Sequence, residues 1–251
     1  MKEVIVVIPI YQLEFTKSEW LSLNQCFKEL GDYPIVVIHP EGLPLNTLSD
    51  KFSYTSVSVD QKYFGSPKAY NKLMLSRFFY ELFEDYNYLL ICQTDVLVIK
   101  DNLQLWTKKD YDYIGAPWLD SYWQIWHNIF LKDGIVKGFR CLFTAHFYNA
   151  IGNGGFSLRK VSSCLEAFDR EKTDLIKWNS NEDYYWGIFA RKNTSNFEIP
   201  SKKEASKFSI ETSPRKALYK LNKGQLPFGL HAWEKFDVSL WKEKLGLITH
   251  G

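Results

Sequence analysis

Two short acidic segments carry the strongest chemical signals in this sequence. Gln93-Thr94-Asp95 directly follows an apolar run, and Asn181-Glu182-Asp183 directly precedes Tyr184-Tyr185-Trp186. A carboxylate that follows a buried strand can hold a divalent cation, which can in turn bridge a diphosphate. A carboxylate buried beside aromatic rings has a raised pKa and suits a general base. Plainer interpretations also stand: Asp95 as a turn or helix cap, and Glu182-Asp183 as the acids favoured at a helix N-terminus.

A glycine-rich segment and a late histidine are two further candidates. Gly152-Asn153-Gly154-Gly155-Phe156-Ser157 has the composition of a loop whose backbone approaches another group closely. It is not a Walker loop, because no Gly-Lys-Ser/Thr follows, and it leads into a strand-like run, which excludes a dinucleotide fingerprint. A bulged turn is the simpler interpretation. His231, between Gly229 and Trp233, is either a metal ligand or a capped core histidine.

The first forty residues predict the elements that would position these groups. The continuous β-branched run over 4–10 is typical of a strand buried on both faces of a parallel sheet. Thr16 and Glu19 have the spacing of a capping box, and Gly31 would end the helix that they begin. A second strand is expected at 34–38. This order of strand, helix and strand predicts an α/β fold.

Later segments continue the same alternation. We expect a helix over 66–82, a buried strand over 88–92, and helices over 161–168 and 182–190. After about residue 200 the pattern loosens into a basic tail. Ligands of open α/β sheets bind beyond the carboxyl ends of the strands. The segments expected at those ends are Pro9-Ile10-Tyr11, His39-Pro40-Glu41 and Gln93-Thr94-Asp95.

Composition and charge narrow the function classes. Aromatic residues make up 17% of the chain, and their faces can stack on sugars as well as fill a core, as we expect for Phe27, Phe78 and Phe79. The net charge of +2 argues against a duplex-binding footprint, so no nucleic-acid partner is expected. Seven basic and two acidic residues lie between Lys202 and Lys223. They indicate either a solvated surface or a site for an anionic ligand or membrane.

The cysteines and the N-terminal residues bear on the compartment. The four cysteines form neither a Cys-x-x-Cys pair nor zinc-finger spacing, which favours a reducing compartment. The apolar run near Met1 is too short for a signal peptide, and no apolar stretch reaches 18 residues. We therefore expect a cytoplasmic protein.

Taken in order, these segments resemble those of GT-A-type nucleotide-sugar glycosyltransferases. The shared features are a first strand ending in Pro-Ile-Tyr, a strand followed by x-x-Asp, a Gly-Gly-Phe-Ser segment, a Glu-Asp pair and a late His. The chain is more specifically similar to an uncharacterised bacterial and plant family with a domain of unknown function, DUF5672. The segments that carry this similarity are 70–74, 111–118, 152–159, 181–183 and 226–233. The resemblance implies a GT-A-like, mostly parallel central sheet flanked by helices.

The resemblance also implies a role for each group of residues. The donor would be bound by Pro9, Tyr11, Glu41, Lys72, Gln93, Thr94, Asp95, Gly154, Gly155 and Arg159. Asp95 and His231 would hold Mn²⁺ or Mg²⁺, although Gln93 stands where the superfamily's metal motif has its first acid. Lys72 and Arg159 could then offset diphosphate charge directly. Asp183, or else Glu182, would be the catalytic base, and Trp118, Tyr184 and Trp186 would bind the acceptor.

The implied function is sugar transfer from a nucleotide-diphosphate sugar to a hydroxyl of a glycan or lipid-linked acceptor. We expect a role in bacterial cell-surface polysaccharide synthesis, with inversion favoured by Glu182-Asp183. One domain is expected, with a nucleotide-binding half over about 1–100 and an acceptor half over about 101–251. The basic segment 202–223 could contact the inner membrane face. Two alternatives stay open: a catalytically inactive carbohydrate-binding protein on the same fold, and a nucleotidyltransferase that releases pyrophosphate.

Overall fold

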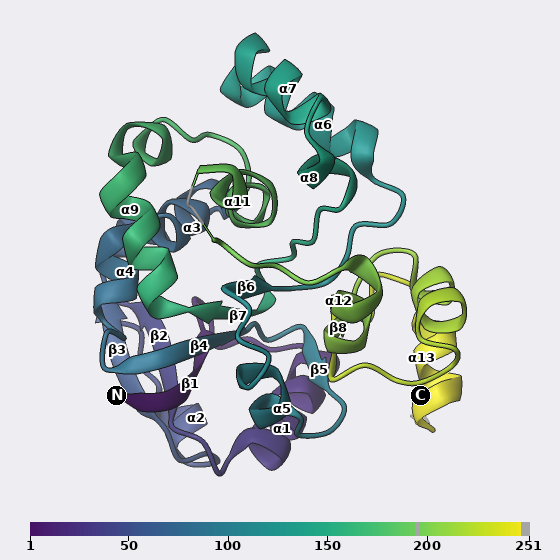
Figure 1. The fold of residues 1–251 in the computed structure, drawn as a ribbon. Helices are drawn as coiled ribbons and strands as arrows, with labels where there is room; N and C mark the ends of the chain where they lie inside the picture. Colours follow the sequence, from purple (N-terminus) through teal and green to yellow (C-terminus); the bar gives the residue numbers. More distant parts are fainter. Residues whose placement is uncertain (194–195, 247–251) are drawn as a thin grey trace.

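Figure 1 shows the computed structural model, which describes residues 1–193 and 196–246. Its main sheet has six strands in the order β3-β2-β1-β4-β7-β6, and a smaller sheet has the order β5-β9-β8. The strands are β1 (Lys2–Pro9), β2 (Ile35–Pro40), β3 (Thr55–Val59), β4 (Tyr86–Cys92), β5 (Val96–Val98), β6 (Tyr113–Ile114), β7 (Phe156–Lys160), β8 (Ser209–Ile210) and β9 (Gly229–His231). Strands β1 to β4 are parallel, whereas β7 is antiparallel to β4 and β6. The predicted α/β class, with a mostly parallel sheet flanked by helices, is confirmed.

The helices alternate with the strands in the first half of the chain and predominate in the second. They are α1 (Lys17–Leu30), α2 (Asn46–Ser49), α3 (Pro67–Met74), α4 (Arg77–Glu81), α5 (Leu103–Thr107), α6 (Tyr122–Asp133), α7 (Ile135–Leu142), α8 (Ala145–Tyr148), α9 (Val161–Ile176), α10 (Glu182–Tyr184), α11 (Ala190–Asn193), α12 (Lys202–Phe208) and α13 (Val238–Leu245). Shorter turns of helix lie at Gln61–Tyr63, Tyr185–Phe189 and Lys216–Leu221. No helix in the described ranges is both long and apolar enough to cross a bilayer.

Strand β1 lies inside the sheet because its residues are apolar and β-branched. Val7 pairs with Val36 on one side and Ile91 on the other, and its side chain is fully buried. The chain builds β2 and β3 on one side of β1 and then returns to place β4 on the other side. The carboxyl ends of β1 and β4 therefore form the switch point at which open α/β sheets bind ligands.

Helix α1 begins as its capping box predicts. The Thr16 hydroxyl accepts a hydrogen bond from the Glu19 amide, and the Glu19 carboxylate accepts one from the Thr16 amide. Leu23 and Leu30 face the core, as expected. Phe27 is only half-buried, and it stacks on Phe52 with ring centroids 4.1 Å apart.

The helix predicted over 66–82 is interrupted near its middle. Ser66 caps α3 as expected, but α3 ends at Met74, and Ser76 begins α4 by accepting a hydrogen bond from the Phe79 amide. The change of direction buries Phe79 and leaves Phe78 45% exposed. The expectation that Phe78 fills the core is therefore wrong.

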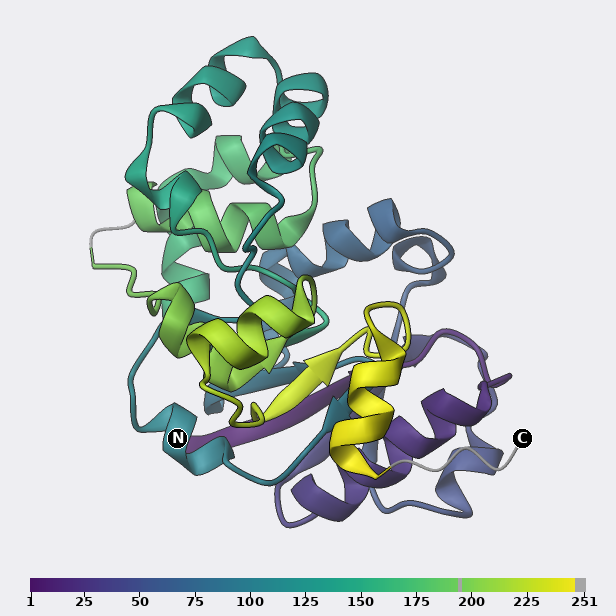
Figure 2. The same ribbon diagram turned by 90° about the vertical axis from the view of Figure 1, so that its right-hand side faces the viewer.

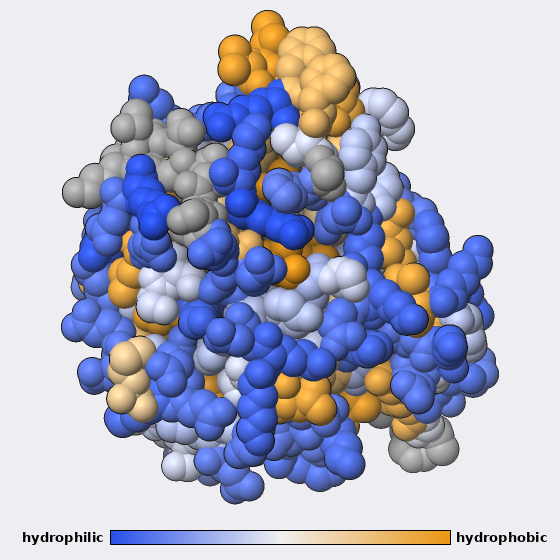
Figure 3. Space-filling view, in the orientation of Figure 1, coloured by the Kyte–Doolittle hydropathy of each residue, from blue (hydrophilic) through white to orange (hydrophobic). Residues whose placement is uncertain are grey.

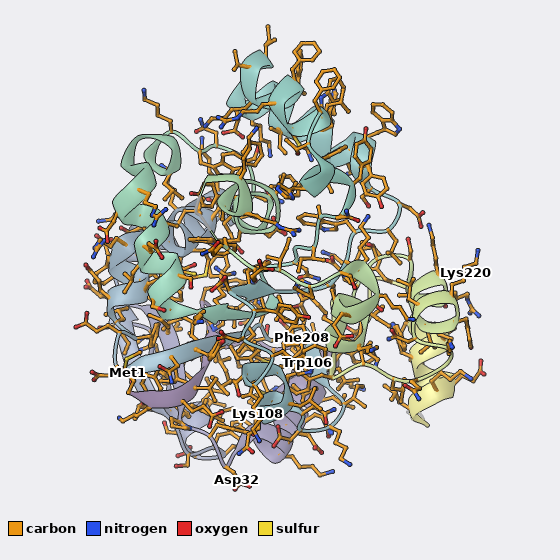
Figure 4. All side chains as sticks on the ribbon, viewed as in Figure 1. Met1, Asp32, Trp106, Lys108, Phe208 and Lys220 are labelled. Atoms are coloured by element: carbon orange, nitrogen blue, oxygen red, sulfur yellow. The ribbon has the colours of Figure 1, made fainter. Side chains whose placement is uncertain are left out.

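The basic tail is more ordered than its composition predicts. Strands β8 and β9 join β5 in the second sheet, and the turns at 216–221 and α13 pack beside it around a separate apolar cluster, while Ala205 and Phe208 of α12 belong to the main core. Trp106 of α5 and Phe208 of α12 connect this part to the main sheet, with ring centroids 5.3 Å apart (Figure 4). The second sheet positions His231, because Val96 and His231 are partners across β5 and β9.

Helices α6, α7 and α8 form a projection from the body of the molecule. Figures 1 and 2 show it at the top, beyond α9 and α11 and away from both chain ends. No helix was predicted in this stretch from the sequence. We call residues 122–148 the α6–α8 projection.

Candidate active site

A cavity of about 440 Å³ opens at the carboxyl ends of β1 and β4. Its walls come from the end of β1, the first turn of α1, the start of α3 and the loop after β4. The lining residues are Pro9, Tyr11, Glu19, Phe64, Gly65, Ser66, Pro67, Tyr70, Gln93, Thr94 and Asp95. The segments predicted at the ends of β1 and β4 therefore meet at one cavity. Glu41 does not join them, because it is exposed just beyond β2.

The lining of this cavity carries two carboxylates and no Lys, Arg or His. Glu19 uses one oxygen to accept a hydrogen bond from Thr94 Oγ1 at 3.0 Å, and the other to cap α1. Asp95 supplies the second carboxylate. A diphosphate placed here would need a cation to offset its charge. Glu19 was predicted only as a cap, because its contact with Thr94 depends on the tertiary fold.

Asp95 lies beside His231 and Glu211, and we call these three residues the cavity-side cluster. His231 Nε2 is 3.2 Å from Asp95 Oδ1, and His231 Nδ1 is 3.4 Å from Glu211 Oε1. Burial lowers the pKa of His231, but the two carboxylates raise it more, to about 10. Burial raises the pKa of Asp95, but His231 outweighs this and leaves it below its ordinary value. Nothing in the sequence pointed to Glu211.

Two atoms of the cavity-side cluster could ligate a divalent cation, provided that the cation displaces the proton that Asp95 and Glu211 hold on His231. Asp95 Oδ1 and His231 Nε2 are buried and have no hydrogen-bond partner among the described residues. Their separation of 3.2 Å suits two ligands that each lie about 2.1 Å from one metal ion. Across the described ranges no group of three His, Cys, Asp or Glu side chains is arranged to hold a metal. The protein would therefore supply two ligands and leave the other positions to phosphate oxygens and water, as is usual for Mg²⁺.

The loop at Gly154-Gly155 needs glycine because charged side chains crowd both residues. A Cβ on Gly155 would overlap with His231 Nε2 and lie 2.6 Å from Gln93 Oε1. A Cβ on Gly154 would overlap with Glu182 Oε1. The predicted close approach of the backbone is therefore found, but the atoms that approach belong to the protein itself.

Arg159 and Glu182 form a buried ion pair on the far side of this loop. Arg159 Nη2 is 2.9 Å from Glu182 Oε1, and the two side chains are 0% and 4% exposed. The guanidinium also donates to Tyr80 and Ser157. Burial alone would lower the pKa of Arg159, but Glu182 helps to raise it well above its ordinary value. We call Tyr80, Ser157, Arg159 and Glu182 the buried cluster.

The buried cluster corrects two predictions. Arg159 is fully enclosed and its donors are occupied by protein groups, so its charge does not reach a donor in the cavity. Glu182 is held against Arg159, so it is not the free base that was offered as an alternative to Asp183. The signal was available in part, since an alternating strand places Arg159 on the same face as Ser157.

Asp183 has the properties of a general base. Its Oδ2 accepts a hydrogen bond from the Asn153 amide at 3.1 Å, while its Oδ1 is buried with no partner among the described residues. Burial, Glu182 and Glu211 together raise its pKa to about 7. Glu211 thus acts on both Asp183 and the cavity-side cluster. Asp183 does not itself line the cavity between β1 and β4.

Four other predicted residues lie differently from expectation. Lys72 is exposed on α3 and outside the cavity lining; its neighbour Tyr70 lines the cavity, and Asn71 accepts a hydrogen bond from the Glu182 amide. Trp186 is fully buried, packed against Tyr80, so it has no face for an acceptor and that prediction is wrong. Trp118 and Tyr184 pack edge to face and are 6% and 8% exposed, which leaves them little surface for a sugar.

Several solved glycosyltransferase structures share this fold. The galactosyltransferase LgtC, solved with donor and acceptor sugar analogues, is similar with a TM-score of 0.59 and 13% identity over 98% of this chain and 97% of that one. Mouse xyloside xylosyltransferase 1 is similar with a TM-score of 0.55 and 9% identity, over 91% of this chain and 97% of that one. The bifunctional glycosyltransferase WbbM has a TM-score of 0.55 and 14% identity over 92% of this chain. The match covers 45% of the WbbM chain. Such low identities establish a GT-A-like fold and not an activity.

The sequence itself gives a family but no characterised relative. No curated protein matches it. Residues 53–231 match the family described as a protein of unknown function, DUF5672. This range is most of the chain and holds β4, the glycine loop, Asp183 and His231. The chain therefore belongs to the DUF5672 family and has a GT-A-like glycosyltransferase fold.

Proposed function

We propose that this protein is a glycosyltransferase that takes a sugar from a nucleotide-diphosphate donor bound in the cavity between β1 and β4. The observation that carries the proposal is the pairing of this cavity with the cavity-side cluster. The cavity lies at the switch point of the sheet and has acidic walls, and two ligand atoms without hydrogen-bond partners lie at its edge. The solved structures of similar fold support the same reaction class.

The donor's diphosphate would be held through Mn²⁺ or Mg²⁺ at Asp95 and His231. The cation would offset the charge that develops on the leaving diphosphate. Gln93 and Thr94 would donate or accept hydrogen bonds at the donor without adding charge to the metal site. Pro9, Tyr11 and Tyr70 would form the wall against the nucleoside.

Asp183 would accept the proton of the acceptor hydroxyl. Its pKa of about 7 leaves it half-ionised near neutral pH, where a base works best. The proton would pass from the hydroxyl to the unpartnered Oδ1, and the oxygen would then attack the anomeric carbon as the diphosphate leaves. A single displacement of this kind inverts the anomeric centre. Identification of the product anomer by NMR tests this role, since retained stereochemistry contradicts it.

The acceptor class, the pathway and the compartment are also proposals. A glycan or lipid-linked hydroxyl acceptor in bacterial cell-surface polysaccharide synthesis, with a cytoplasmic enzyme, remains our expectation from the sequence. The membrane contact expected for residues 202–223 has less support, because ion pairs occupy three of the seven basic side chains in this segment. Lys207 pairs with Glu204, Arg215 with Asp237 and Lys216 with Asp120.

The test is a calorimetric screen of nucleoside diphosphates and sugar nucleotides, with and without Mn²⁺ or Mg²⁺, followed by an assay of donor hydrolysis. We expect one nucleotide class to bind only with the cation and to raise the melting temperature. We also expect release of a nucleoside diphosphate from its sugar conjugate. Binding without release would indicate an inactive binding protein, which the neutral Gln93 would then explain. Release of pyrophosphate from a nucleoside triphosphate would indicate a nucleotidyltransferase instead.

A further inference from the structure

The α6–α8 projection exposes an unusual amount of apolar surface. Of the fourteen large apolar side chains that the described residues expose, seven lie in this segment of 27 residues. They are Trp123 (70%), Leu131 (65%), Ile135 (62%), Val136 (80%), Phe139 (49%), Phe143 (81%) and Tyr148 (50%). Figure 3 shows the same concentration as a hydrophobic cap over α6 and α7. Patches of this kind mark interaction surfaces.

This surface is not needed to hold the projection together. The inner faces of the helices are already packed, because Ile125 and Ile129 of α6 and Cys141 of α7 are buried in the main apolar core. The two helices meet where Phe130 packs directly over Gly138. Ile135 and Phe139 of α7 and Phe143 directly after it fall four residues apart, as along one face of a helix that lies on a surface, and Val136 is exposed beside Ile135.

Unpaired basic side chains surround the apolar cap. Lys132, Arg140, Arg191 and Lys192 take part in no ion pair among the described residues. The charges of Arg140, Arg191 and Lys192 lie close together. Burial lowers the pKa of Lys192, and the charge of Arg140 lowers it further. Burial also lowers the pKa of His146, and the charges of Arg191 and Lys192 add to this effect.

The nearest acid on the projection faces inward. Asp133, at the end of α6, is half-buried, and its Oδ1 accepts a hydrogen bond from the Asn179 amide at 2.7 Å. The cap is therefore apolar at its tip and cationic at its rim.

We propose that the α6–α8 projection docks the protein on an anionic lipid bilayer. The exposed apolar side chains would enter the boundary between headgroups and acyl chains, and the basic rim would lie at the negatively charged headgroups. Charge complementarity favours this occupant over a second copy of the chain, because two such surfaces would bring like charges together. This docking does not depend on the proposed function.

The projection is joined to the segment that carries Asp183. Asn128 of α6 donates to the Tyr184 hydroxyl at 3.5 Å, and the Ser180 hydroxyl donates to the Asn128 carbonyl. A bilayer held by the projection would thus lie on the side of the candidate base, where a lipid-linked acceptor would enter. The choice of acceptor class, unlike the docking, does rest on the proposed function.

Co-sedimentation with vesicles tests the docking. The full chain is mixed with vesicles of phosphatidylcholine alone or of phosphatidylcholine with phosphatidylglycerol, at low and at physiological salt. We expect binding that needs the anionic lipid. The double variant Val136→Glu/Phe143→Glu should bind about tenfold or more weakly, because two apolar anchors become charged. Arg140→Glu/Lys192→Glu should lose the preference for anionic lipid, and Leu105→Glu, at a 52% exposed site on α5, should bind as the wild type does.

A second measurement keeps the test independent of variant stability. A solvatochromic dye on Phe143→Cys should brighten with anionic vesicles, and the same dye on Leu105→Cys should not. The proposal is overturned if the wild type does not bind anionic vesicles or if Val136→Glu/Phe143→Glu binds undiminished. It is also overturned if Lys220→Glu/Lys223→Glu abolishes binding instead. The same holds if the only effect of Val136→Glu/Phe143→Glu is to convert a dimer to a monomer in sedimentation equilibrium.

Discussion

The two charged clusters on either side of Gly154-Gly155 both contain charged side chains but differ in their exposure and in their hydrogen-bond partners. In the cavity-side cluster, Asp95 and His231 lie 3.2 Å apart without hydrogen-bond partners among the described residues, and the Asp95 side chain is 45% exposed. In the buried cluster, Arg159 and Glu182 are almost completely enclosed, and Arg159 has several protein partners. Arg159, whose guanidinium is bonded to protein groups away from the cavity, maintains the fold, whereas unsatisfied atoms beside a cavity, as in Asp95, can take a ligand.

Asp183 shares properties with both clusters. It neighbours Glu182 in the chain, yet no cation among the described residues pairs with it, and Glu211 of the cavity-side cluster adds to its raised pKa. The comparison therefore predicts that substitutions in the buried cluster act on stability. Substitutions in the cavity-side cluster and at Asp183 should act on ligand binding and turnover.

The largest expected effect is that of Asp183→Asn on turnover. Loss of a general base typically costs about 10²- to 10⁴-fold in rate, while the neutral amide keeps the size of the side chain. We expect kcat to fall by this amount with donor affinity unchanged, measured by steady-state kinetics and calorimetry. Asp120→Asn, at an exposed ion pair, is the matched control and should keep full activity. A fully active Asp183→Asn variant would show that the base lies elsewhere.

Glu182→Ala should have the largest effect on stability. Removing one partner of a buried pair leaves Arg159 as an uncompensated buried charge, which costs about 3–5 kcal/mol. The free energy of unfolding in urea measures this loss. Glu204→Ala removes a carboxylate that pairs with Lys109 and Lys207 near the surface, and it should cost about 1 kcal/mol or less. Equal losses in the two variants would remove the distinction between the clusters.

His231→Ala should lower metal affinity, and because it also removes the cation between Asp95 and Glu211, its melting temperature is measured beside that of the wild type. If Asp95 and His231 are the protein's ligands, calorimetry with Mn²⁺ alone should show affinity lowered about tenfold or more. His127→Ala, on the exposed face of α6, is the matched control. Unchanged Mn²⁺ affinity in His231→Ala would contradict the proposed ligand pair.

The sequence could predict the parts of the site that follow from strand ends. The positions of Pro9 and Gln93-Thr94-Asp95 at the cavity depend only on where two buried strands stop. Lys72 was the wrong choice on α3, because neighbouring helical residues point about 100° apart and Tyr70 and Asn71 face the site instead.

The remaining misses involve contacts between distant parts of the chain. Trp186 was predicted in the acceptor site, but the π-helical turn at 185–189 buries its ring completely. Glu211 meets His231 only because β8 and β9 pair. No local pattern encodes either arrangement.

The pH dependence separates Asp183 from both clusters through two opposite trends. Its pKa of about 7 in the folded protein exceeds its ordinary value of about 3.9, because burial and nearby carboxylates penalise the charged form. Activity should therefore rise as pH increases through about 7 and fall about tenfold per unit below it. The contribution of Asp183 to stability has the other sign: between pH 4 and 7 the folded state binds more protons than the unfolded state, so stability declines as pH rises. Other carboxylates also titrate over this window, but they are common to both proteins, so thermal melts should show the stability of the wild type declining relative to that of Asp183→Asn as pH rises. A parallel decline in both would assign the proton to another group and leave Asp183 ionised throughout.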